Sequence, residues 1–385
     1  MPTFIFRAAL LLSCFTQAAF AADYRIETVA EELSYPWSLA FLPGGEYLVA
    51  ERDGQVQRLA ADGSRRALTG VPETYFAGQG GFFDILLDPD FADNSIVYLS
   101  YAHGTPTDNG TGVVRARLSE AALEDPQLIL LSDPSRDTPQ HYGGRMLFLP
   151  DGTLLVTVGD GFEYREGAQD INQQLGKILR INSDGSIPQD NPFYAQGGPA
   201  AKVWTYGHRN PQGLAMDRQR NMVYMHEHGP RGGDEVNRVL PAKNYGWPAV
   251  THGINYSGAY VSPFTEHPGM EPALKVWTPS IGPSGLAYYD GAAFPQWNNS
   301  LFVGALVNKD VRRLSLAAGK VTDEEILFAE IDMRIRDLRQ GPDGLLYIIT
   351  DGEQGSLLRV LPANAGENIR GREYKGSVTT DNHSR

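Results

Sequence analysis

Two arginines with the spacing of an anion-binding pair stand near the end of this 385-residue chain. Arg334 and Arg336 lie two positions apart, directly before an apolar run, so in extended backbone both side chains project to the same side. Two guanidinium groups on one face repel each other unless an anion lies between them. Lys309 directly follows another apolar run, 301–306. These cations are either solvated surface charges or parts of an anion site.

A second cationic motif stands at the start of another apolar run. Arg209 and Asn210 directly precede this run, and both side chains carry several hydrogen-bond donors. Such donors suit a ligand that is rich in carbonyl and carboxylate oxygens, although Arg209 could equally pair with an Asp of a neighbouring element. If the fold brings Arg209, Lys309, Arg334 and Arg336 together, the sequence predicts a site for one small polyanionic ligand.

One histidine has the position expected of a base beside these cations. His141 precedes its own apolar run much as Arg209 and Arg334 precede theirs, so we expect it to face the same site. Neighbouring cations lower the pKa of an imidazole and keep it neutral near pH 7, the state that can accept a proton. The alternative is a structural or merely exposed histidine.

The segment 226–235 is rich in potential metal ligands. Its two histidines, two residues apart and close to Glu side chains, could indicate zinc. Glycine and proline dominate the segment, however, and Asp234 and Glu235 come with free backbone carbonyls, a mixture that favours Ca²⁺. The segment 244–248 extends the motif. The alternative is a glycine-rich loop that is held by internal hydrogen bonds.

The candidate site residues stand at the ends of a pattern that recurs along the chain. The pattern is an apolar run, a turn with Pro, Asp or Gly, and a second β-rich run. About six copies recur roughly 45 to 72 residues apart, a period typical of a β-propeller with loop insertions. Each copy reads as a β-hairpin. The copies occupy residues 39–50, 85–100, 146–157, 214–226, 286–304 and 338–350. We therefore predict an all-β fold, a six-bladed β-propeller of four-stranded antiparallel blades, in which residues far apart in sequence meet at one site where the blades converge.

Composition limits the function classes. The net charge of −13 argues against binding to nucleic acid or to an anionic membrane, because both need basic patches. The templates Gly-x-Ser-x-Gly and His-Glu-x-x-His are absent, and the glycine-rich run 78–81 is too short for a phosphate loop. The length fits one propeller domain, 22–364, followed by a polar segment, 365–385, that we expect to be disordered.

The first residues predict export. Residues 1–21 contain Arg7, an apolar stretch and the small-x-small site Ala19-Phe20-Ala21, as in a secretory signal peptide. The apolar stretch is shorter than the roughly 20 residues of a membrane span. The single cysteine, Cys14, lies within this segment, where it faintly resembles a lipoprotein signal, but the apolar run before it is short. We expect a periplasmic or secreted protein without disulfides.

With these residues in place, the chain resembles the soluble quinoprotein sugar dehydrogenases, among them the periplasmic aldose sugar dehydrogenases. These are six-bladed propellers that use pyrroloquinoline quinone (PQQ) and Ca²⁺. The resemblance runs from Pro36 to Gly352, nearly the whole mature chain. Its motifs are Gly78-Gln-Gly-Gly81, His141-Tyr-Gly-Gly-Arg145, Gly207-His-Arg-Asn-Pro-Gln-Gly213, Glu227-His-Gly-Pro-Arg-Gly-Gly-Asp-Glu235, Asn244-Tyr-Gly-Trp-Pro248 and Arg334-Ile-Arg-Asp337.

The resemblance implies a role for each matching residue. Gln79 would lie near the quinone, His141 would be the general base, and Arg209 would help Ca²⁺ to polarise the quinone. Gly229 and Pro230 would offer backbone oxygens to this Ca²⁺. Two further candidate ligands for a calcium position are Glu235 and Tyr245. The residues implied to hold PQQ are Arg209, Asn210, Tyr256, Lys309, Arg334 and Arg336.

The implied function is the oxidation of an aldose at C1 to the lactone, with electrons passed to an external acceptor. Two other functions remain open at this point. One is a non-catalytic propeller that binds protein partners, since a fold alone does not define a function. The other is a Ca²⁺-dependent lactone hydrolase, which would need one axial metal ringed by Glu, Asn and Asp and no cluster of cations.

Overall fold

A computed structural model describes residues 23–62 and 64–363 of the chain. The predicted signal peptide, 1–21, and the predicted tail, 365–385, lie outside the described residues. In the part that the structure describes, no helix is long and apolar enough to cross a membrane.

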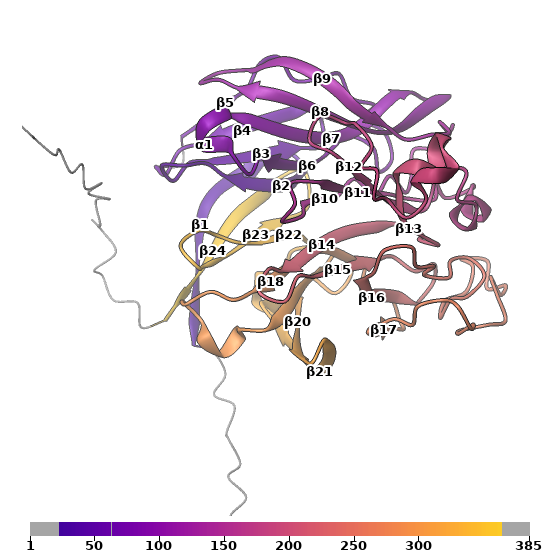
Figure 1. Ribbon diagram of the computed structural model, residues 1–385. Coiled ribbons are helices and arrows are strands. Elements are labelled where there is room, and N and C mark those ends of the chain that lie inside the picture. Colours follow the sequence, from indigo (N-terminus) through magenta and orange to yellow (C-terminus); the bar gives the residue numbers. More distant parts are fainter. Residues whose placement is uncertain (1–22, 63, 364–385) are drawn as a thin grey trace, which may run out of the picture.

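The described residues form six sheets of four antiparallel strands each, arranged as a six-bladed β-propeller (Figure 1). The predicted fold is thereby confirmed. Blade 1 consists of β2 (Pro36–Phe41), β3 (Tyr47–Glu51), β4 (Gln55–Leu59) and β5 (Arg65–Ala67). Blade 2 consists of β6 (Phe82–Leu87), β7 (Ile96–Thr105), β8 (Asp108–Leu118) and β9 (Leu123–Leu131). Blade 3 consists of β10 (Met146–Phe148), β11 (Leu154–Val158), β12 (Lys177–Ile181) and β13 (Val203–Tyr206).

The other three blades follow the same plan. Blade 4 consists of β14 (Pro211–Asp217), β15 (Met222–Glu227), β16 (Asp234–Val239) and β17 (Lys275–Trp277). Blade 5 consists of β18 (Pro283–Tyr289), β19 (Ser300–Ala305), β20 (Val311–Ala317) and β21 (Lys320–Leu327). Blade 6 consists of β22 (Ile335–Gln340), β23 (Leu346–Thr350), β24 (Gly355–Pro362) and β1 (Tyr24–Leu33). The short helices are α1 (Phe91–Asn94), η1 (Arg165–Gln169), η2 (Tyr194–Gln196), η3 (Gly198–Lys202), η4 (Pro295–Trp297) and η5 (Ala329–Ile331).

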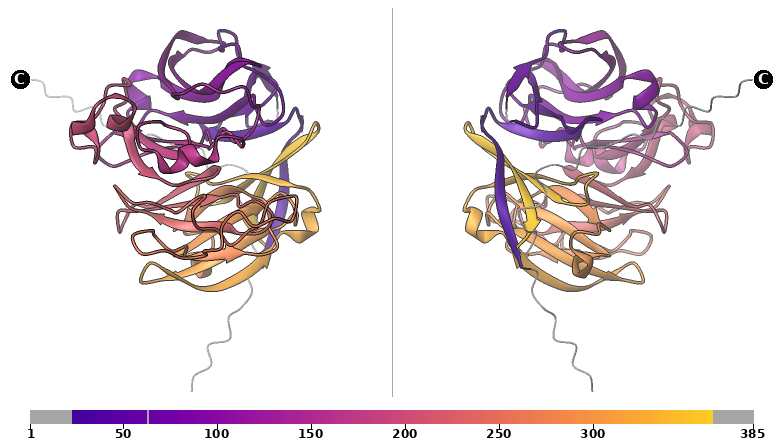
Figure 2. Two further views of the ribbon diagram at one scale, coloured as in Figure 1. Left: turned by 90° about the vertical axis from the view of Figure 1, so that its right-hand side faces the viewer. Right: turned by 90° about the vertical axis from the view of Figure 1, so that its left-hand side faces the viewer.

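The ring closes through the two ends of the described chain. β1 pairs with β24 from Tyr24 opposite Pro362 to Leu33 opposite Gly355, so the first strand completes the last blade. Figure 2 shows these two strands side by side, in indigo and yellow. With β1, blade 6 has four strands, as the other blades do. Because β1 leads directly into β2, the backbone also connects blade 6 to blade 1.

The six predicted hairpins are the first two strands of the six blades. Turns such as the one at Gly152, which has φ of +80°, reverse the chain between these strands. Every residue of β3, β11 and β23 is buried, because each of these strands lies between neighbouring blades. The core therefore lies between the blades; in one cluster Leu48 of blade 1 packs with Phe82 and Leu99 of blade 2.

A buried ionic network ties blades 2, 3 and 6 together. Arg145 lies between Asp84 and Asp337, with N···O distances of 3.3 and 3.0 Å, and Arg339 pairs with the same two carboxylates at 2.6 and 2.9 Å. Two cations thus balance two buried carboxylates, which leaves no uncompensated charge. Arg145 also donates to the Gln212 carbonyl at 2.9 Å, so the network supports the segments that carry the candidate site.

Candidate active site

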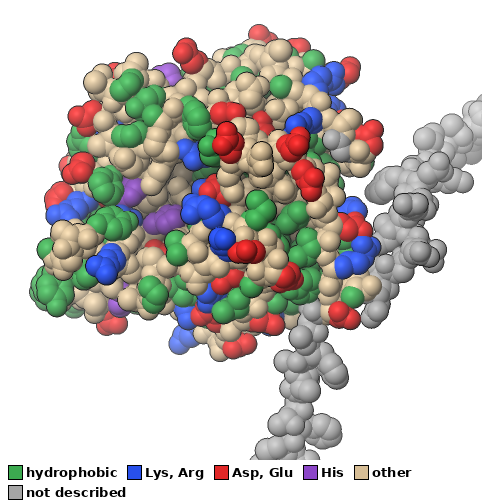
Figure 3. Space-filling view, turned by 180° about the vertical axis from the view of Figure 1, so that it is seen from behind, with side chains coloured by type: hydrophobic (Ala, Val, Ile, Leu, Met, Phe, Trp, Pro, Cys, Tyr) green, Lys and Arg blue, Asp and Glu red, His purple; other side chains and the backbone are tan. Residues whose placement is uncertain are grey.

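Segments from all six blades line one cavity of about 940 Å³. Figure 3 shows its hollow on one face of the molecule, with histidine and with arginine or lysine side chains in and around it. Nine of the twelve predicted site residues line this cavity. They are Gln79, His141, Arg209, Asn210, Gly229, Pro230, Tyr256, Arg334 and Arg336.

The other three predicted residues lie elsewhere. Lys309 is not among the residues that line the cavity; its half-exposed side chain pairs with Asp332 at 3.0 Å. Glu235 and Tyr245 line a separate small cavity together with Glu227. Arg209 lines both cavities, so this second site lies directly behind the first.

His141 forms a buried pair with Asp160, which lies two residues after β11 and directly before the turn 161–164. Nδ1 of His141 lies 2.7 Å from Oδ1 of Asp160, which also accepts a hydrogen bond from the backbone N–H of Phe162 at 2.8 Å. Oδ2 of Asp160 accepts a hydrogen bond from Nε1 of Trp247 at 2.7 Å. An ionised Asp160 accepts from a protonated Nδ1, which leaves Nε2 of His141 with a free lone pair.

The surroundings of this pair favour neutral His141 and ionised Asp160. Burial lowers the pKa of His141 below its ordinary value; Asp160 acts in the opposite direction, and Arg209 in the same direction as burial. Burial alone would raise the pKa of Asp160, but the charge and hydrogen bond of His141, and then Arg209, bring it below its ordinary value. The arrangement is that of a general base with an orienting carboxylate.

The backbone of His141 is held in an unusual conformation. Its φ of +51° lies in the left-handed region, which only a few per cent of non-glycine residues adopt, although histidine does so more often than most. Oε1 of Gln79 accepts a hydrogen bond from the His141 N–H at 2.9 Å, and Oδ1 of Asn210 accepts one from the Gly143 N–H at 3.1 Å. Gly159 leaves the necessary space, because a Cβ there would lie 2.1 Å from the His141 carbonyl oxygen. Gln79 and Asn210 therefore hold the backbone around His141.

Arg209 is fixed from several sides. Oε2 of Glu227 accepts a hydrogen bond from the Arg209 N–H at 2.6 Å. Nη1 of Arg209 donates to the carbonyl oxygens of Gly229 and His228 at 2.6 and 3.1 Å, and its guanidinium lies 5.4 Å from the ring centre of Trp247. Within the described residues it forms no ion pair with an Asp of a neighbouring blade, the alternative that the sequence left open.

Arg334 and Arg336 both project toward one carboxylate. Nε of Arg334 lies 2.8 Å from Oδ2 of Asp351, and Nε of Arg336 lies 2.9 Å from its Oδ1. The anion between the two guanidinium groups is therefore a residue of the chain. Burial raises the pKa of Asp351, but Arg336 and Arg334 outweigh this effect and hold it below its ordinary value. Two cations and one carboxylate leave a net positive charge at this wall.

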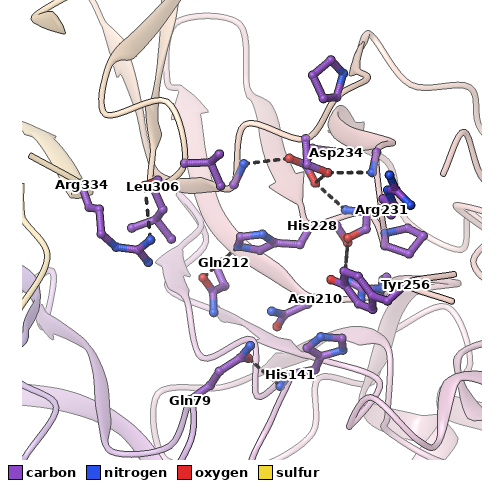
Figure 4. Close-up of a pocket in the computed structure, with 18 of the residues that line it drawn as sticks. Gln79, His141, Asn210, Gln212, His228, Arg231, Asp234, Tyr256, Leu306 and Arg334 are labelled. Carbon is purple, nitrogen blue, oxygen red and sulfur yellow. Dashed lines mark hydrogen bonds between the residues drawn. The ribbon is translucent and has the colours of Figure 1, made fainter. Parts of the chain in front are cut away.

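The sequence reasoning missed several residues that line the cavity, among them two further cations. The guanidinium of Arg52 lies 6.0 and 5.6 Å from the ring centres of Tyr35 and Phe76, and its Nη2 donates to the carbonyl of Gly78 at 2.6 Å. Arg231 is exposed, and in Figure 4 it lies across the cavity from Arg334. Arg231 stood in the predicted metal-ligand segment, whereas no motif in the sequence marked Arg52.

The two histidines of segment 226–235 do not converge on one metal. Nε2 of His226 lies 2.5 Å from the Ser284 carbonyl, while Nε2 of His228 lies 3.2 Å from Oε1 of Gln212. Among the described residues there is no group of three or more His, Cys, Asp and Glu side chains that could hold a metal ion. A metal site here would therefore have to include backbone oxygens.

The small second cavity is lined by two carboxylates, those of the buried Glu227 and the partly buried Glu235. Burial, and next the charge of Glu227, raise the pKa of Glu235 to about 8. Nδ2 of Asn237, a residue outside the cavity lining, donates to Glu235 at 3.3 Å, and Oδ1 of Asn237 is buried without a hydrogen-bond partner among the described residues. The Tyr245 hydroxyl donates to the Arg238 carbonyl and accepts from the Leu240 N–H, so only the backbone oxygen of Tyr245 remains for a cation.

The sequence profile of the glucose/sorbosone dehydrogenase family matches residues 33–359. The aldose sugar dehydrogenase of Escherichia coli is 41% identical over 362 residues, which cover 92% of this chain and 97% of that protein. Quinoprotein glucose dehydrogenase B of Acinetobacter calcoaceticus is 28% identical over 86% of each chain.

Solved structures of similar proteins agree with this match. The apo form of the soluble E. coli aldose sugar dehydrogenase superimposes with a TM-score of 0.85 at 40% identity, covering 88% of this chain and 99% of that one. Because the profile spans nearly the whole propeller and the relatives match from end to end, the predicted resemblance is confirmed: the chain belongs to the glucose/sorbosone dehydrogenase family.

Proposed function

We propose that this protein is a PQQ- and Ca²⁺-dependent dehydrogenase that oxidises aldoses at C1 to the lactone. The observation that carries the proposal is that the buried His141–Asp160 pair and the guanidinium groups of Arg209 and Arg336 line the same cavity. A base for a hydroxyl proton and a site for a polyanion are thus combined in one place. Names of relatives support it, because they include sugar dehydrogenases and a quinoprotein.

The cavity fits PQQ, a planar molecule with three carboxylates. Its volume of about 940 Å³ is at the upper end of the range of roughly 300–1,000 Å³ for small-ligand sites. Arg209, Arg334 and Arg336 would hold the carboxylates and carbonyls, with Asn210 beside them. The exposed ring of Tyr256 at the rim would cover one face of the cofactor. Lys309 would contribute only if its side chain left Asp332.

The residues at two places also fit Ca²⁺. Gly229 and Pro230 line the main cavity beside Arg209, and their carbonyl oxygens are of the kind that Ca²⁺ prefers. The Gly229 oxygen already accepts from Arg209, so it would bind Ca²⁺ through its second lone pair. In the second cavity, the charge of Glu227 raises the pKa of the partly buried Glu235, and a divalent cation would offset the repulsion between the two carboxylates. We propose Glu235, with the Tyr245 backbone oxygen, as ligands at this second position.

The chain's own residues would carry out the proton transfer. When bound, PQQ supplies the acceptor for the hydride from C1, and Ca²⁺ supplies positive charge beside it. Nε2 of His141 accepts the proton of the C1 hydroxyl, and the Asp160 carboxylate stabilises the imidazolium that forms. Arg209, fixed by Glu227 and the Gly229 carbonyl, is preorganised to stabilise developing negative charge. Electrons would then pass to an external acceptor.

Two observations disfavour the alternatives. A lactone hydrolase of this fold would need a metal ringed by acidic and amide side chains and no cluster of cations, whereas Arg209, Arg334 and Arg336 line this cavity. A non-catalytic binding propeller would have no use for a buried base with an orienting carboxylate. The predicted signal peptide supports a further proposal, that the enzyme acts in the periplasm or outside the cell.

The proposal is tested by mixing the purified apoprotein with PQQ, Ca²⁺, an aldose and a dye acceptor. We expect reduction of the dye that depends on both the sugar and PQQ, and formation of the lactone. Absence of turnover with a panel of hexoses and pentoses, under conditions in which PQQ is bound, would contradict it. A reaction mixture without PQQ serves as the control for contaminating dehydrogenases.

A further inference from the structure

Trp247 contacts both the carboxylate partner of the base and the catalytic cation. The side chain is 7% exposed and does not line the main cavity. Its Nε1 donates to Oδ2 of Asp160 at 2.7 Å, and its ring lies 5.4 Å from the guanidinium carbon of Arg209. One rigid indole thus contacts both Asp160 and Arg209, and the proposed reaction requires these two groups at fixed positions relative to each other.

The indole N–H is well suited to orient a carboxylate. It is a donor only, so it cannot take the proton that His141 accepts. The fully buried Asp160 has three donors: Nδ1 of His141 and the Phe162 N–H on Oδ1, and Trp247 on Oδ2. Without the indole, Oδ2 would have no donor among the described residues, and the carboxylate plane would be fixed from one oxygen alone.

The backbone around Trp247 is clamped to the segment that follows Asp160. The Trp247 N–H donates to the Gly207 carbonyl at 2.9 Å, and the Trp247 carbonyl accepts from Nε2 of Gln169 at 2.8 Å. The side-chain amides of Gln169 and Asn244 exchange hydrogen bonds of 3.0 and 2.8 Å. Because Gln169 lies at the end of η1, these contacts fix the indole relative to the Asp160 turn.

We propose that Trp247 is a positioning residue that orients the Asp160 carboxylate, and through it the His141 imidazole, while its ring face supports Arg209. The inference rests on the proposed function, because it concerns the same base and cation. It predicts that the indole N–H affects the chemical step and the proton affinity of His141, but hardly affects the binding of the cofactor.

The test removes the indole N–H and keeps an aromatic ring at the position. Trp247→Phe keeps an aromatic face under Arg209 and removes the donor to Asp160. The other charged and titratable groups around the base and the indole stay in place; they are Arg136, Arg209, Glu227, His228 and Glu235. Trp277→Phe is a matched control, because the buried Trp277 donates from Nε1 to a carboxylate, Glu324, at 2.8 Å between the fourth strands of blades 4 and 5.

The first measurement uses the apoprotein and needs no turnover. An Asp160 carboxylate that loses a donor attracts the His141 proton more strongly, so the pKa of His141 rises. By NMR, the imidazole titration of His141, assigned with His141→Gln, should move up by about half a pH unit or more in Trp247→Phe and stay unchanged in Trp277→Phe. In the loaded enzyme, kcat should fall about tenfold or more while KM and PQQ affinity stay within about twofold.

A measurement on the parent protein guards against a variant that does not fold. The Trp247 Nε1–H resonance should shift with the same apparent pKa as the His141 ring, because both bind one carboxylate. An indole resonance that does not respond to the titration of His141 would overturn the inference, and so would an unchanged His141 titration in folded Trp247→Phe. Either result would contradict the role of Trp247 and leave the proposed function intact. Absence of turnover in the parent would contradict the proposed function, but the apoprotein titrations would still test the role of Trp247.

Discussion

Asp351 lies directly beside Arg336, with one carboxylate oxygen 2.9 Å from the guanidinium Nε, and its other oxygen is bound by Arg334. Asp351 therefore aligns the two cations in the absence of a ligand, since it holds both on the same wall of the cavity. Nη1 of Arg334 donates to the Leu306 carbonyl at 3.4 Å, and Nη2 of Arg336 also pairs with Asp351 at 2.9 Å. Among the described residues, Nη2 of Arg334 and Nη1 of Arg336 remain available for the carboxylates of a cofactor.

This relationship predicts the effect of removing the two arginines. Arg334→Ala/Arg336→Ala should weaken PQQ binding by about several hundredfold or more, because hydrogen bonds to charged groups contribute roughly 1.5–3 kcal/mol each. Equilibrium titration followed by fluorescence measures the affinity. Arg313→Ala is the control, because Arg313 pairs with Glu325 in an outer part of blade 5. Parental affinity in the double variant would place the cofactor elsewhere.

A second prediction concerns stability at low pH. Burial lowers the pKa of His226 to about 3, so between about pH 3 and 6.5 the unfolded chain binds more protons than the folded one. Stability is therefore lost as the pH falls through this window, by about 1 kcal/mol per pH unit from this residue. Urea unfolding at pH 7 and pH 5 measures the slope.

The variant His226→Gln should flatten that slope, because its amide keeps a donor toward the Ser284 carbonyl and does not titrate. His267→Gln, on an exposed loop, should leave the slope unchanged. An unaltered slope in folded His226→Gln would assign the acid sensitivity to other groups.

A third prediction concerns the second cavity. Ca²⁺ should raise the melting temperature of the apoprotein, and a chelator should reverse the effect, because the cation offsets the repulsion between Glu227 and Glu235. Glu235→Gln should remove most of this Ca²⁺-dependent increment. Glu266→Gln, on an exposed loop, should retain it. Equal increments in both variants would mean that the stabilising ion binds outside this cavity.

The fold was predictable from sequence because its signals are local. Each of the six inner hairpins carries its own apolar runs and turn residues within about twenty residues. The pairing of β1 with β24 was not predictable in this way, since it joins Tyr24 to Pro362 and no local pattern records the contact. Strands of three residues, such as β5, are too short to leave a periodic signal.

In the candidate site, too, residues near local sequence patterns were predictable and the others were not. His141, Arg209 and Arg336 were predictable because each stands at the entrance of an inner strand, and the propeller brings these entrances together. Asp351 follows the second strand of blade 6, and Arg52 follows the second strand of blade 1. Both residues lie just beyond the predicted hairpins 338–350 and 39–50, so the repeated pattern did not mark them. Lys309 lies outside the lining because its side chain pairs with Asp332.

The central claim is that His141 is the base of a PQQ-dependent sugar oxidation, and one stopped-flow measurement tests it directly. His141→Gln, loaded with PQQ and Ca²⁺, is mixed with an excess of aldose, and reduction of the cofactor is followed by absorbance. We predict a cofactor affinity close to that of the parent and a reduction rate lower by about 10²-fold or more. A reduction rate equal to that of the parent, in enzyme shown to hold the cofactor, would contradict the account.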